Sequence, residues 1–324
     1  MRARAYWTVA PGRGELRPEE LPAPGPGEAL VRATASGVSR GSELLVHRGG
    51  VPAPVAARMR APFQSGDLSG PGPVKYGYLS VGVVEDGDAE WLGRRVFCLH
   101  PHQDRYVVPV TALTVLPDDV PDARAVLLGT LETAVNALWD GRPLYGDRVA
   151  VVGGGMVGAC VTALLSRMPL ERLELVDPDP VRAGLADRLG ARGIPPQEAT
   201  GGCDLVLHCS ATDAGLQRAL SLLGDEGEVV ELSWYGDRPV TVDLGADFHA
   251  RRLRLRASQV STVSPHRAAR RDHAGRMQVA LRAAADPRLD HLLAGPTPFE
   301  ELPALMDRLA DGAPGLCHVV RYQP

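Results

Sequence analysis

The chain has 324 residues, of which 44% are hydrophobic, and its formal net charge at pH 7 is −4. This length and apolar content predict about two domains with packed cores. Charges of both signs are interspersed, which argues against nucleic acid or an anionic membrane surface as a partner. No apolar run approaches the length of a membrane span, and the N-terminal stretch lacks the apolar core of a signal peptide. We therefore expect a soluble, cytoplasmic protein with no membrane contact.

The five cysteines, at positions 98, 160, 203, 209 and 317, include no Cys-x-x-Cys pair. Scattered cysteines in odd number argue against a disulfide framework and against a structural zinc lobe held by four cysteines.

The first part of the chain, up to about residue 118, shows short strand patterns separated by Gly and Pro. These patterns lie at residues 28–35, 79–85, 94–99 and 105–110. Closely spaced short strands predict a compact, partly closed β-rich domain. The long connection at residues 36–76 is rich in Gly, Pro, Arg and Ser, and a connection of that length is expected to be functional.

From residue 124 onward, helices and strands alternate. The pattern predicts strands at 149–152, 173–177, 204–208, 227–232 and 252–258, and helices at 124–140, 156–167, 181–189 and 214–223. These five strands and their helices fit an α/β, doubly wound Rossmann sheet, which in its usual form has six strands. The last segment carries helices near 273–285 and 299–310 and a strand at 317–322. We expect it to return to the first domain, so that the domains are 1–118 with 259–324, and 119–258.

Three glycines follow the first strand of this second domain in the spacing G-x-G-x-x-G, at Gly153, Gly155 and Gly158. The first allows a tight turn, the second lets the backbone approach a pyrophosphate, and the third lets the next helix pack closely on its strand. The helix begins at Met156 and Val157, whose N–H groups are expected to face the phosphates. The motif predicts a bound dinucleotide.

Asp177 ends the next strand, where its carboxylate can accept hydrogen bonds from both hydroxyls of the adenosine ribose. A carboxylate there repels a 2′-phosphate, so we expect NAD(H) rather than NADP(H). Arg182 lies close to Asp177 in the sequence, which weakens the expected preference for NAD(H) over NADP(H). Ser210 and Ser233 follow two later strands, at the strand ends that are expected to face the nicotinamide.

Four stretches resemble the medium-chain dehydrogenase/reductase superfamily of zinc alcohol dehydrogenases and quinone reductases. They are Ala35-Ser-Gly-Val-Ser-Arg-Gly-Ser-Glu43, Tyr76-Gly-Tyr-Leu-Ser-Val-Gly-Val-Val-Glu85, the region 129–137, and the glycine motif with Asp177. The first two look most like the bacteriochlorophyllide dehydrogenase-like branch. The resemblance covers nearly the whole chain and implies a GroES-like catalytic domain, a homodimer, and cofactor contacts from Arg40, Thr130 and Thr133.

The catalytic zinc ligands of that superfamily are missing. Its cysteine falls on Ser39 or Arg40, its His-Glu pair on Tyr78 and Leu79, and its third ligand on Gly129. A catalytic zinc needs three side-chain donors of the nitrogen, sulfur or carboxylate type. We therefore expect no metal.

Four residues are candidates to replace the metal. Lys75, the only lysine of the chain, and Tyr78 could supply a hydrogen-bonding electrophile, with the lysine lowering the pKa of the phenol. His47 and Glu43 could form a proton relay. For each of them, packing or solvation without a catalytic role is the alternative.

A metal site elsewhere is conceivable at Cys98, His100 and His102, because a strand would place these three side chains on one face. Pro101 interrupts the strand there and the sequence offers no partner carboxylate, so we assign no metal to them.

These observations predict a zinc-independent, NAD(H)-dependent oxidoreductase. It would transfer a hydride between nicotinamide C4 and the alcohol or carbonyl carbon of a small molecule in an interdomain cleft. The alternatives are a zinc-free, NADPH-dependent enoyl or quinone reductase and a non-catalytic dinucleotide-binding protein. The sequence does not identify the substrate.

Overall fold

The computed structural model describes residues 1–70 and 72–323, which divide into two compact units. The first unit comprises residues 1–129 and 292–324, and the second comprises residues 130–291.

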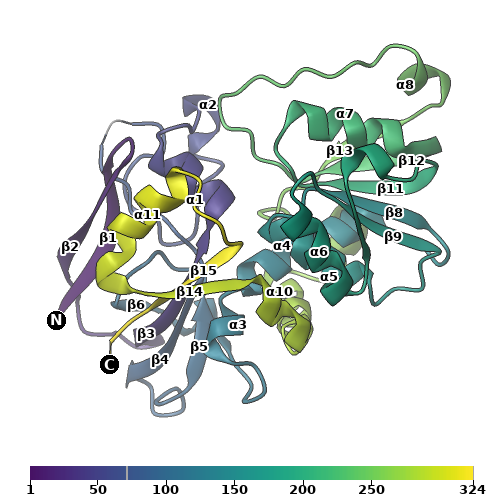
Figure 1. Cartoon of the computed structure of the whole chain (residues 1–324). Coiled ribbons are helices and arrows are strands. Elements are labelled where there is room, and N and C mark those ends of the chain that lie inside the picture. Colours follow the sequence, from purple (N-terminus) through teal and green to yellow (C-terminus); the bar gives the residue numbers. More distant parts are fainter. Residues whose placement is uncertain (71, 324) are drawn as a thin grey trace. The chain divides into compact units, whose positions relative to one another are not determined.

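The described residues of the first unit form a mixed seven-stranded sheet and a separate hairpin (Figure 1). The sheet runs in the order β14-β15-β3-β4-β5-β7, with β6 paired to β3. Its strands are β3 (Glu28–Ser39), β4 (Ser80–Gly87), β5 (Arg95–Cys98), β6 (Arg105–Pro109), β7 (Leu113–Val115), β14 (Leu293–Pro298) and β15 (Cys317–Arg321). The predicted β-rich domain is confirmed. Its N-terminal hairpin of β1 (Arg2–Ala10) and β2 (Arg13–Glu20) was not predicted.

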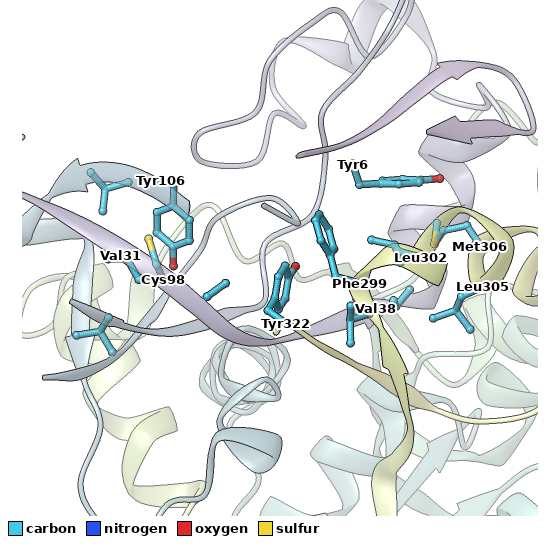
Figure 2. Packing of buried hydrophobic residues seen from close by; sticks show 14 of the residues in the cluster. Tyr6, Val31, Val38, Cys98, Tyr106, Phe299, Leu302, Leu305, Met306 and Tyr322 are labelled. Atoms are coloured by element: carbon cyan, nitrogen blue, oxygen red, sulfur yellow. The ribbon is translucent and has the colours of Figure 1, made fainter. Parts of the chain in front are cut away.

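Short helices complete the first unit. They are α1 (Arg40–His47), α2 (Ala53–Ala56), α3 (Asp122–Ala125) and α11 (Leu302–Ala310), with single turns η1 (Val110–Ala112) and η4 (Phe299–Glu301). The buried positions of α11 recur at Leu302, Leu305, Met306 and Leu309, which is one face of a helix. This face packs into the core of the unit, where the rings of Phe299 and Tyr322 stack at 4.5 Å (Figure 2).

The second unit contains a parallel six-stranded sheet in the order β10-β9-β8-β11-β12-β13 among its described residues. The strands are β8 (Arg148–Val152), β9 (Arg172–Val176), β10 (Arg192–Ile194), β11 (Cys203–His208), β12 (Leu223–Glu231) and β13 (Arg254–Ala257). The chain winds outward from β8 in one direction and then from β11 in the other. The predicted doubly wound sheet is confirmed, and β8 and β11 flank the point at which such sheets bind ligands.

Helices precede, connect and follow these strands. They are α4 (Leu128–Gly141), α5 (Met156–Leu165), α6 (Pro180–Leu189), α7 (Asp213–Leu222), α8 (Asp247–Ala250), α9 (Pro265–Ala268) and α10 (His273–Ala283), with the turns η2 (Pro196–Glu198) and η3 (Pro287–Leu292). The ends of α6 follow the local sequence: the Asp179 side chain accepts a hydrogen bond from the Val181 N–H, and Gly190 adopts a left-handed conformation with φ +86°. No helix in the described part of the chain is long and apolar enough to cross a membrane.

Residues 259–291 group with the second unit, whereas the sequence pattern placed them with the first domain. The reason is a buried arginine of α10. Arg276, which is 1% exposed, forms an ion pair of 3.0 Å with Glu132 and donates a hydrogen bond of 2.7 Å to the Asn136 side chain. Both partners lie on α4, so this buried network holds α10 to the second unit.

Candidate functional site

The glycine turn after β8 has the geometry that the motif predicts. Gly153 has φ +107°, and a Cβ at this position would lie 2.7 Å from the backbone nitrogen of Ser210. A Cβ at Gly158 would lie 1.9 Å from the carbonyl oxygen of Gly153. Both positions therefore exclude a side chain, because Gly153 packs on the backbone of the turn after β11 and Gly158, on α5, packs on Gly153 itself.

The second glycine of the motif faces open space. A Cβ added at Gly155 would meet no atom within 4 Å. Among the described residues, the N–H groups of Gly155, Met156 and Val157 donate to no acceptor. Unpaired N–H groups at the start of a helix attract an anion such as a phosphate, through hydrogen bonds and the positive end of the helix dipole.

Asp177 is fixed beside this turn. Its Oδ2 accepts a hydrogen bond of 2.6 Å from the Gly154 N–H, and its Oδ1 accepts one of 2.9 Å from the Asp179 N–H. Arg182 lies nearby, with its Nη1 3.9 Å from Asp177 Oδ2 and its Nε 3.5 Å from Asp179 Oδ2. The carboxylate and the guanidinium thus lie together, as the sequence predicted.

A cavity of about 300 Å³ opens beside Asp177. It is lined by Asp177, Pro178, Pro180, Ala183, Gly184, Asp187, Gly193 and Pro195. Apart from Asp177 and Asp187 its walls are small or apolar, and such walls suit a flat heterocycle such as adenine. The residues of this unit therefore fit a dinucleotide.

The two predicted serines belong to one hydrogen-bond cluster at the carboxyl ends of β11 and β12. Ser210 Oγ lies 2.7 Å from His208 Nε2, and His208 Nδ1 lies 2.7 Å from Glu231 Oε2. The N–H of Ser233 donates a 2.7 Å hydrogen bond to Glu231 Oε1, and its Oγ accepts one of 3.1 Å from the Ala211 N–H. His208 and Glu231 join the two serines in this cluster and were not among the predicted site residues, because each lies in a run that is typical of an ordinary strand.

Thr130 and Thr133 lie on α4. Thr130 is buried and Thr133 is half-buried. Their cofactor contacts, implied by the resemblance, stay a prediction.

The positions that the resemblance assigns to zinc ligands meet in the first unit. The Tyr78 hydroxyl donates a hydrogen bond of 2.5 Å to Ser39 Oγ. A Cβ at Gly129 would lie 2.7 Å from Leu79 Cδ2 and 3.6 Å from Tyr78 Cδ2. Two hydroxyls and a glycine thus occupy the place of the three metal ligands.

Tyr78 carries a neutral phenol. Burial raises its pKa above the usual value, and its hydrogen bonds with Ser39 and Ser42 offset this only in part. We expected Lys75 to lower the pKa of Tyr78, but the lysine side chain is hydrogen-bonded to other residues. Its Nζ donates to Glu19 Oε2 at 2.7 Å and to Gln103 Oε1 at 2.9 Å. Because these partners tie the ammonium group to β2 and to the loop before β6, Lys75 does not bond to Tyr78.

Glu43 is the centre of a buried hydrogen-bond chain in the first unit. Its Oε1 accepts a 2.7 Å hydrogen bond from the Ser39 N–H, and its Oε2 lies 2.8 Å from His102 Nε2. His102 Nδ1 lies 2.7 Å from Ser36 Oγ, which lies 2.9 Å from the Tyr322 hydroxyl. A neutral His102 satisfies every group: Tyr322 donates to Ser36, Ser36 to His102, and His102 to Glu43.

His47 does not join this chain. Its Nδ1 lies 3.1 Å from the Tyr6 hydroxyl, and its Nε2 lies 3.7 Å from Asp307 Oδ1. Burial lowers the pKa of His47, so the ring is neutral at pH 7. The predicted relay between Glu43 and His47 is therefore not formed, because the two side chains, one helical turn apart on α1, bond to different partners.

Arg40 binds the end of α11. Its guanidinium donates to the carbonyl oxygens of Ala313 at 2.7 Å and of Leu309 and Gly315 at 3.4 Å each. These bonds satisfy backbone carbonyls at and after the end of the helix. The pyrophosphate contact implied by the resemblance stays a prediction.

The sequence analysis also missed three members of the Glu43 chain: Ser36, His102 and Tyr322. A signal existed in the alternating Cys98, His100 and His102. The sequence offers no nearby carboxylate as a partner for these side chains. In the folded chain, Glu43 is the carboxylate partner of His102.

The chain is similar in sequence or in fold to several known dehydrogenases. No family model matches the chain. It is 30% identical over 152 residues to L-threonine 3-dehydrogenase of Bacillus velezensis, which is 43% of this chain and 44% of that protein. It is 24% identical over 148 residues, 42% of this chain and 43% of that protein, to 2-dehydro-3-deoxy-L-galactonate 5-dehydrogenase of Pseudoalteromonas atlantica. The matched stretches span less than half the length of these two relatives.

Solved structures match over almost the full length. L-idonate 5-dehydrogenase of Escherichia coli superimposes with a TM-score of 0.81 at 15% identity, covering 99% of this chain and 98% of that one. A Sinorhizobium meliloti protein classed with the zinc-binding dehydrogenases and bound to NADP gives 0.79 at 18% identity, covering 99% of each chain. An Escherichia coli alcohol dehydrogenase in complex with NADH gives 0.76 at 17% identity, covering 100% of this chain and 99% of that one.

The chain therefore has the fold of these dehydrogenase structures. The fold that the sequence resemblance implies is confirmed.

A zinc ion does not fit the residues at the positions that the resemblance assigns to zinc ligands. They hold Ser39 or Arg40, Tyr78 with Leu79, and Gly129, which supply no imidazole, thiolate or carboxylate. Within residues 1–70 and 72–323, no group of three His, Cys, Asp or Glu side chains is arranged to hold a metal ion. We therefore derive no chemical step through zinc.

Proposed function

We propose that this protein is a zinc-independent, NAD(H)-dependent oxidoreductase acting on the alcohol or carbonyl carbon of a small molecule. The main support for the proposal is that the hydrogen-bonded pair Ser39–Tyr78 stands in place of metal ligands. The second unit of the same fold has residues that fit a dinucleotide. The dehydrogenase activities of the two curated relatives support the reaction class.

The cofactor is a nicotinamide dinucleotide in this proposal, and when bound it supplies or accepts the hydride. The N–H groups of Gly155, Met156 and Val157 would hold the pyrophosphate, and Asp177 would accept the ribose hydroxyls. We propose NAD(H) rather than NADP(H) because the fixed carboxylate repels a 2′-phosphate.

The Ser39–Tyr78 pair would hold the substrate oxygen. Tyr78 already donates to Ser39, so the Ser39 hydroxyl keeps its own hydrogen for an acceptor. A donor whose oxygen accepts a hydrogen bond is strengthened by polarisation. The pair would therefore stabilise the alkoxide that forms when a carbonyl accepts a hydride. Ser39 would pass its proton to that alkoxide and regain one from Tyr78, which water would then reprotonate.

Glu43 and His102 would position this pair. Glu43 fixes the backbone of Ser39 through the Ser39 N–H, and His102 fixes Glu43. Neither residue needs to touch the substrate for this role.

The test combines calorimetry with turnover assays on a panel of polyols and secondary alcohols. We expect NADH to bind more tightly than NADPH, turnover to survive chelators, and purified protein to lack stoichiometric zinc. Ser39→Ala and Tyr78→Phe should lower kcat, with NADH affinity unchanged. Stoichiometric zinc that is required for turnover would contradict the proposal.

A second candidate function rests on Arg182. Its guanidinium, 3.9 Å from the Asp177 carboxylate, is a cation that a 2′-phosphate would attract. This favours a zinc-free, NADPH-dependent enoyl or quinone reductase, for which strict NADPH use with a conjugated substrate is the expected result. NADH binding without turnover on any panel member would instead indicate a non-catalytic dinucleotide-binding protein. The homodimer implied by the resemblance is part of the proposal and is tested by light scattering.

A further inference from the structure

The cluster at the carboxyl ends of β11 and β12 contains a serine, a histidine and a glutamate in one line of hydrogen bonds. Ser210 Oγ lies 2.7 Å from one ring nitrogen of His208, and Glu231 Oε2 lies 2.7 Å from the other. The hydride transfer proposed above makes no use of this arrangement. We propose that Ser210 is an activated nucleophile, and that the second unit reacts with small activated acyl esters through Ser210, His208 and Glu231.

The glutamate sets the tautomer of the histidine. Glu231 accepts hydrogen bonds from His208 Nδ1 and from the N–H of Ser233, and it accepts a third, of 3.0 Å, from the Tyr235 hydroxyl. An acceptor-only carboxylate requires the proton of His208 on Nδ1. The lone pair of Nε2 then faces the Ser210 hydroxyl, which is the arrangement a general base needs.

The electrostatics of the cluster agree with this assignment. Burial alone would raise the pKa of Glu231, but the hydrogen bonds from His208 and Ser233 outweigh it and the pKa is lowered. The carboxylate is therefore ionised at neutral pH and can stabilise an imidazolium beside it. His208 is fully buried, so this stabilisation is little screened by solvent.

The serine is presented at the start of α7. Ser210 is half-buried, whereas the histidine behind it is buried. A Cβ at Gly215, in the first turn of α7, would lie 2.0 Å from Ser210 Oγ. The hydroxyl thus lies against the positive end of this ten-residue helix, which favours an oxyanion.

The backbone around the serine is held in an uncommon conformation. Ala211 has φ +53°, which side-chain-bearing residues rarely adopt, and its N–H donates to Ser233 Oγ at 3.1 Å. Ser210 Oγ also lies 2.9 Å from Thr212 Oγ1. The turn after β11 is therefore fixed by partners on both sides of the serine.

The chemistry balances without an oxidant or a reductant. Ser210 Oγ forms a bond to the acyl carbon while its proton moves to His208 Nε2. The bond from the acyl carbon to the leaving oxygen breaks, and His208 returns the proton to that oxygen. Water then attacks the acyl-serine by the same route and releases a carboxylic acid and the free serine.

The experiment uses the full chain without any nicotinamide nucleotide, with p-nitrophenyl acetate as the probe and mass spectrometry of the acetylated protein. We expect a burst of nitrophenol, one acetyl group per chain, and its location on Ser210. Ser210→Ala should abolish the burst, and His208→Gln should slow it by about 100-fold or more. Ser221→Ala is the matched control, because Ser221 lies on α7 and bonds to Arg218 outside the cluster.

Two results would overturn the proposal. One is wild-type protein that remains unacetylated while its unfolding transition shows a folded chain. The other is acetylation that maps to another residue and persists in Ser210→Ala. Since the assay contains no nucleotide, either result leaves the proposed oxidoreductase activity to be decided separately.

Discussion

Glu43 and His102 lie 59 positions apart in the sequence, yet their side chains form a 2.8 Å hydrogen bond in the core of the first unit. Their side chains are 3% and 1% exposed. The other oxygen of Glu43 holds the Ser39 N–H, and Ser39 accepts the hydrogen bond of Tyr78. The pair therefore links the core of the unit to the hydroxyls that replace the metal ligands.

Breaking this pair should destabilise the protein strongly. His102→Ala would leave the Glu43 carboxylate buried without its main partner, and losses of about 3 to 5 kcal/mol are typical of such changes. Urea unfolding measures the loss. The control is Glu300→Gln, which removes a half-exposed ion pair with Arg4 and should cost less than about 1 kcal/mol. Equal losses of stability in His102→Ala and Glu300→Gln would contradict a strong stabilising role for the buried Glu43–His102 pair.

Asp177→Asn should weaken NADH binding by about 10- to 100-fold, because charge-assisted hydrogen bonds to the ribose contribute about 1.5 to 3 kcal/mol. The same change should narrow the gap between NADH and NADPH, since the repulsion of the 2′-phosphate is removed. Calorimetry with both nucleotides is the measurement. Asp225→Asn, at an exposed ion pair with Arg251 outside the cavity, is the control and should leave both affinities nearly unchanged.

Lys75 and Tyr78 should differ in their effects on catalysis. Tyr78→Phe removes the hydrogen bond to Ser39 and should lower kcat by about 100-fold, as the loss of a positioned proton donor does. Lys75→Arg keeps a cation near Glu19 and should change kcat little while lowering the thermal midpoint. Steady-state kinetics beside thermal unfolding separate the two effects. A large loss of kcat in Lys75→Arg, with little change in Tyr78→Phe, would instead indicate that Lys75 is the electrophile.

His100 should make the protein less stable as the pH falls. Burial lowers the pKa of His100 to about 3, whereas an unfolded histidine titrates near about 6.5. Between these values the unfolded chain binds a proton that the folded chain does not. Stability is thus full above the unfolded pKa and falls by about 1.4 kcal/mol for each pH unit below it.

Urea unfolding between pH 6.5 and 4.5 tests the contribution of His100. His100→Phe keeps a ring that can stack on Tyr106, as His100 does at 3.8 Å. It should reduce the slope of the unfolding free energy against pH by the contribution of one proton. His249→Gln, at an exposed position, should leave the slope as it is. An unchanged slope in His100→Phe would show that other groups cause the pH dependence.

NADH should protect Ser210 from acetylation. The backbone of Ser210 packs on the glycine turn, since a Cβ at Gly153 would lie 2.7 Å from its nitrogen. A dinucleotide that covers the turn should therefore slow the burst with p-nitrophenyl acetate by at least about 10-fold at saturation, and AMP less. Equal burst rates with and without saturating NADH would place the nucleotide elsewhere.

The N-terminal hairpin shows one limit of what could be predicted. The expected strands at 28–35, 79–85, 94–99 and 105–110 were found because their apolar runs end at Gly or Pro. The β1–β2 hairpin was missed because β2 is polar along its length. Its strand character comes from pairing with β1, which is not a property of either segment alone.

The sequence by itself determined the Rossmann sheet, the glycine turn and its carboxylate. These depend on local properties: the period of apolar residues, the conformational freedom of glycine, and the short span between a strand and its helix. Tertiary structure alone decided that Lys75 pairs with Glu19 and Gln103, that Glu43 bonds to His102 rather than relaying to His47, and that His208 and Glu231 align with Ser210. The physical reason is that a hydrogen bond acts over about 3 Å, and only the folded chain brings such distant segments within that reach.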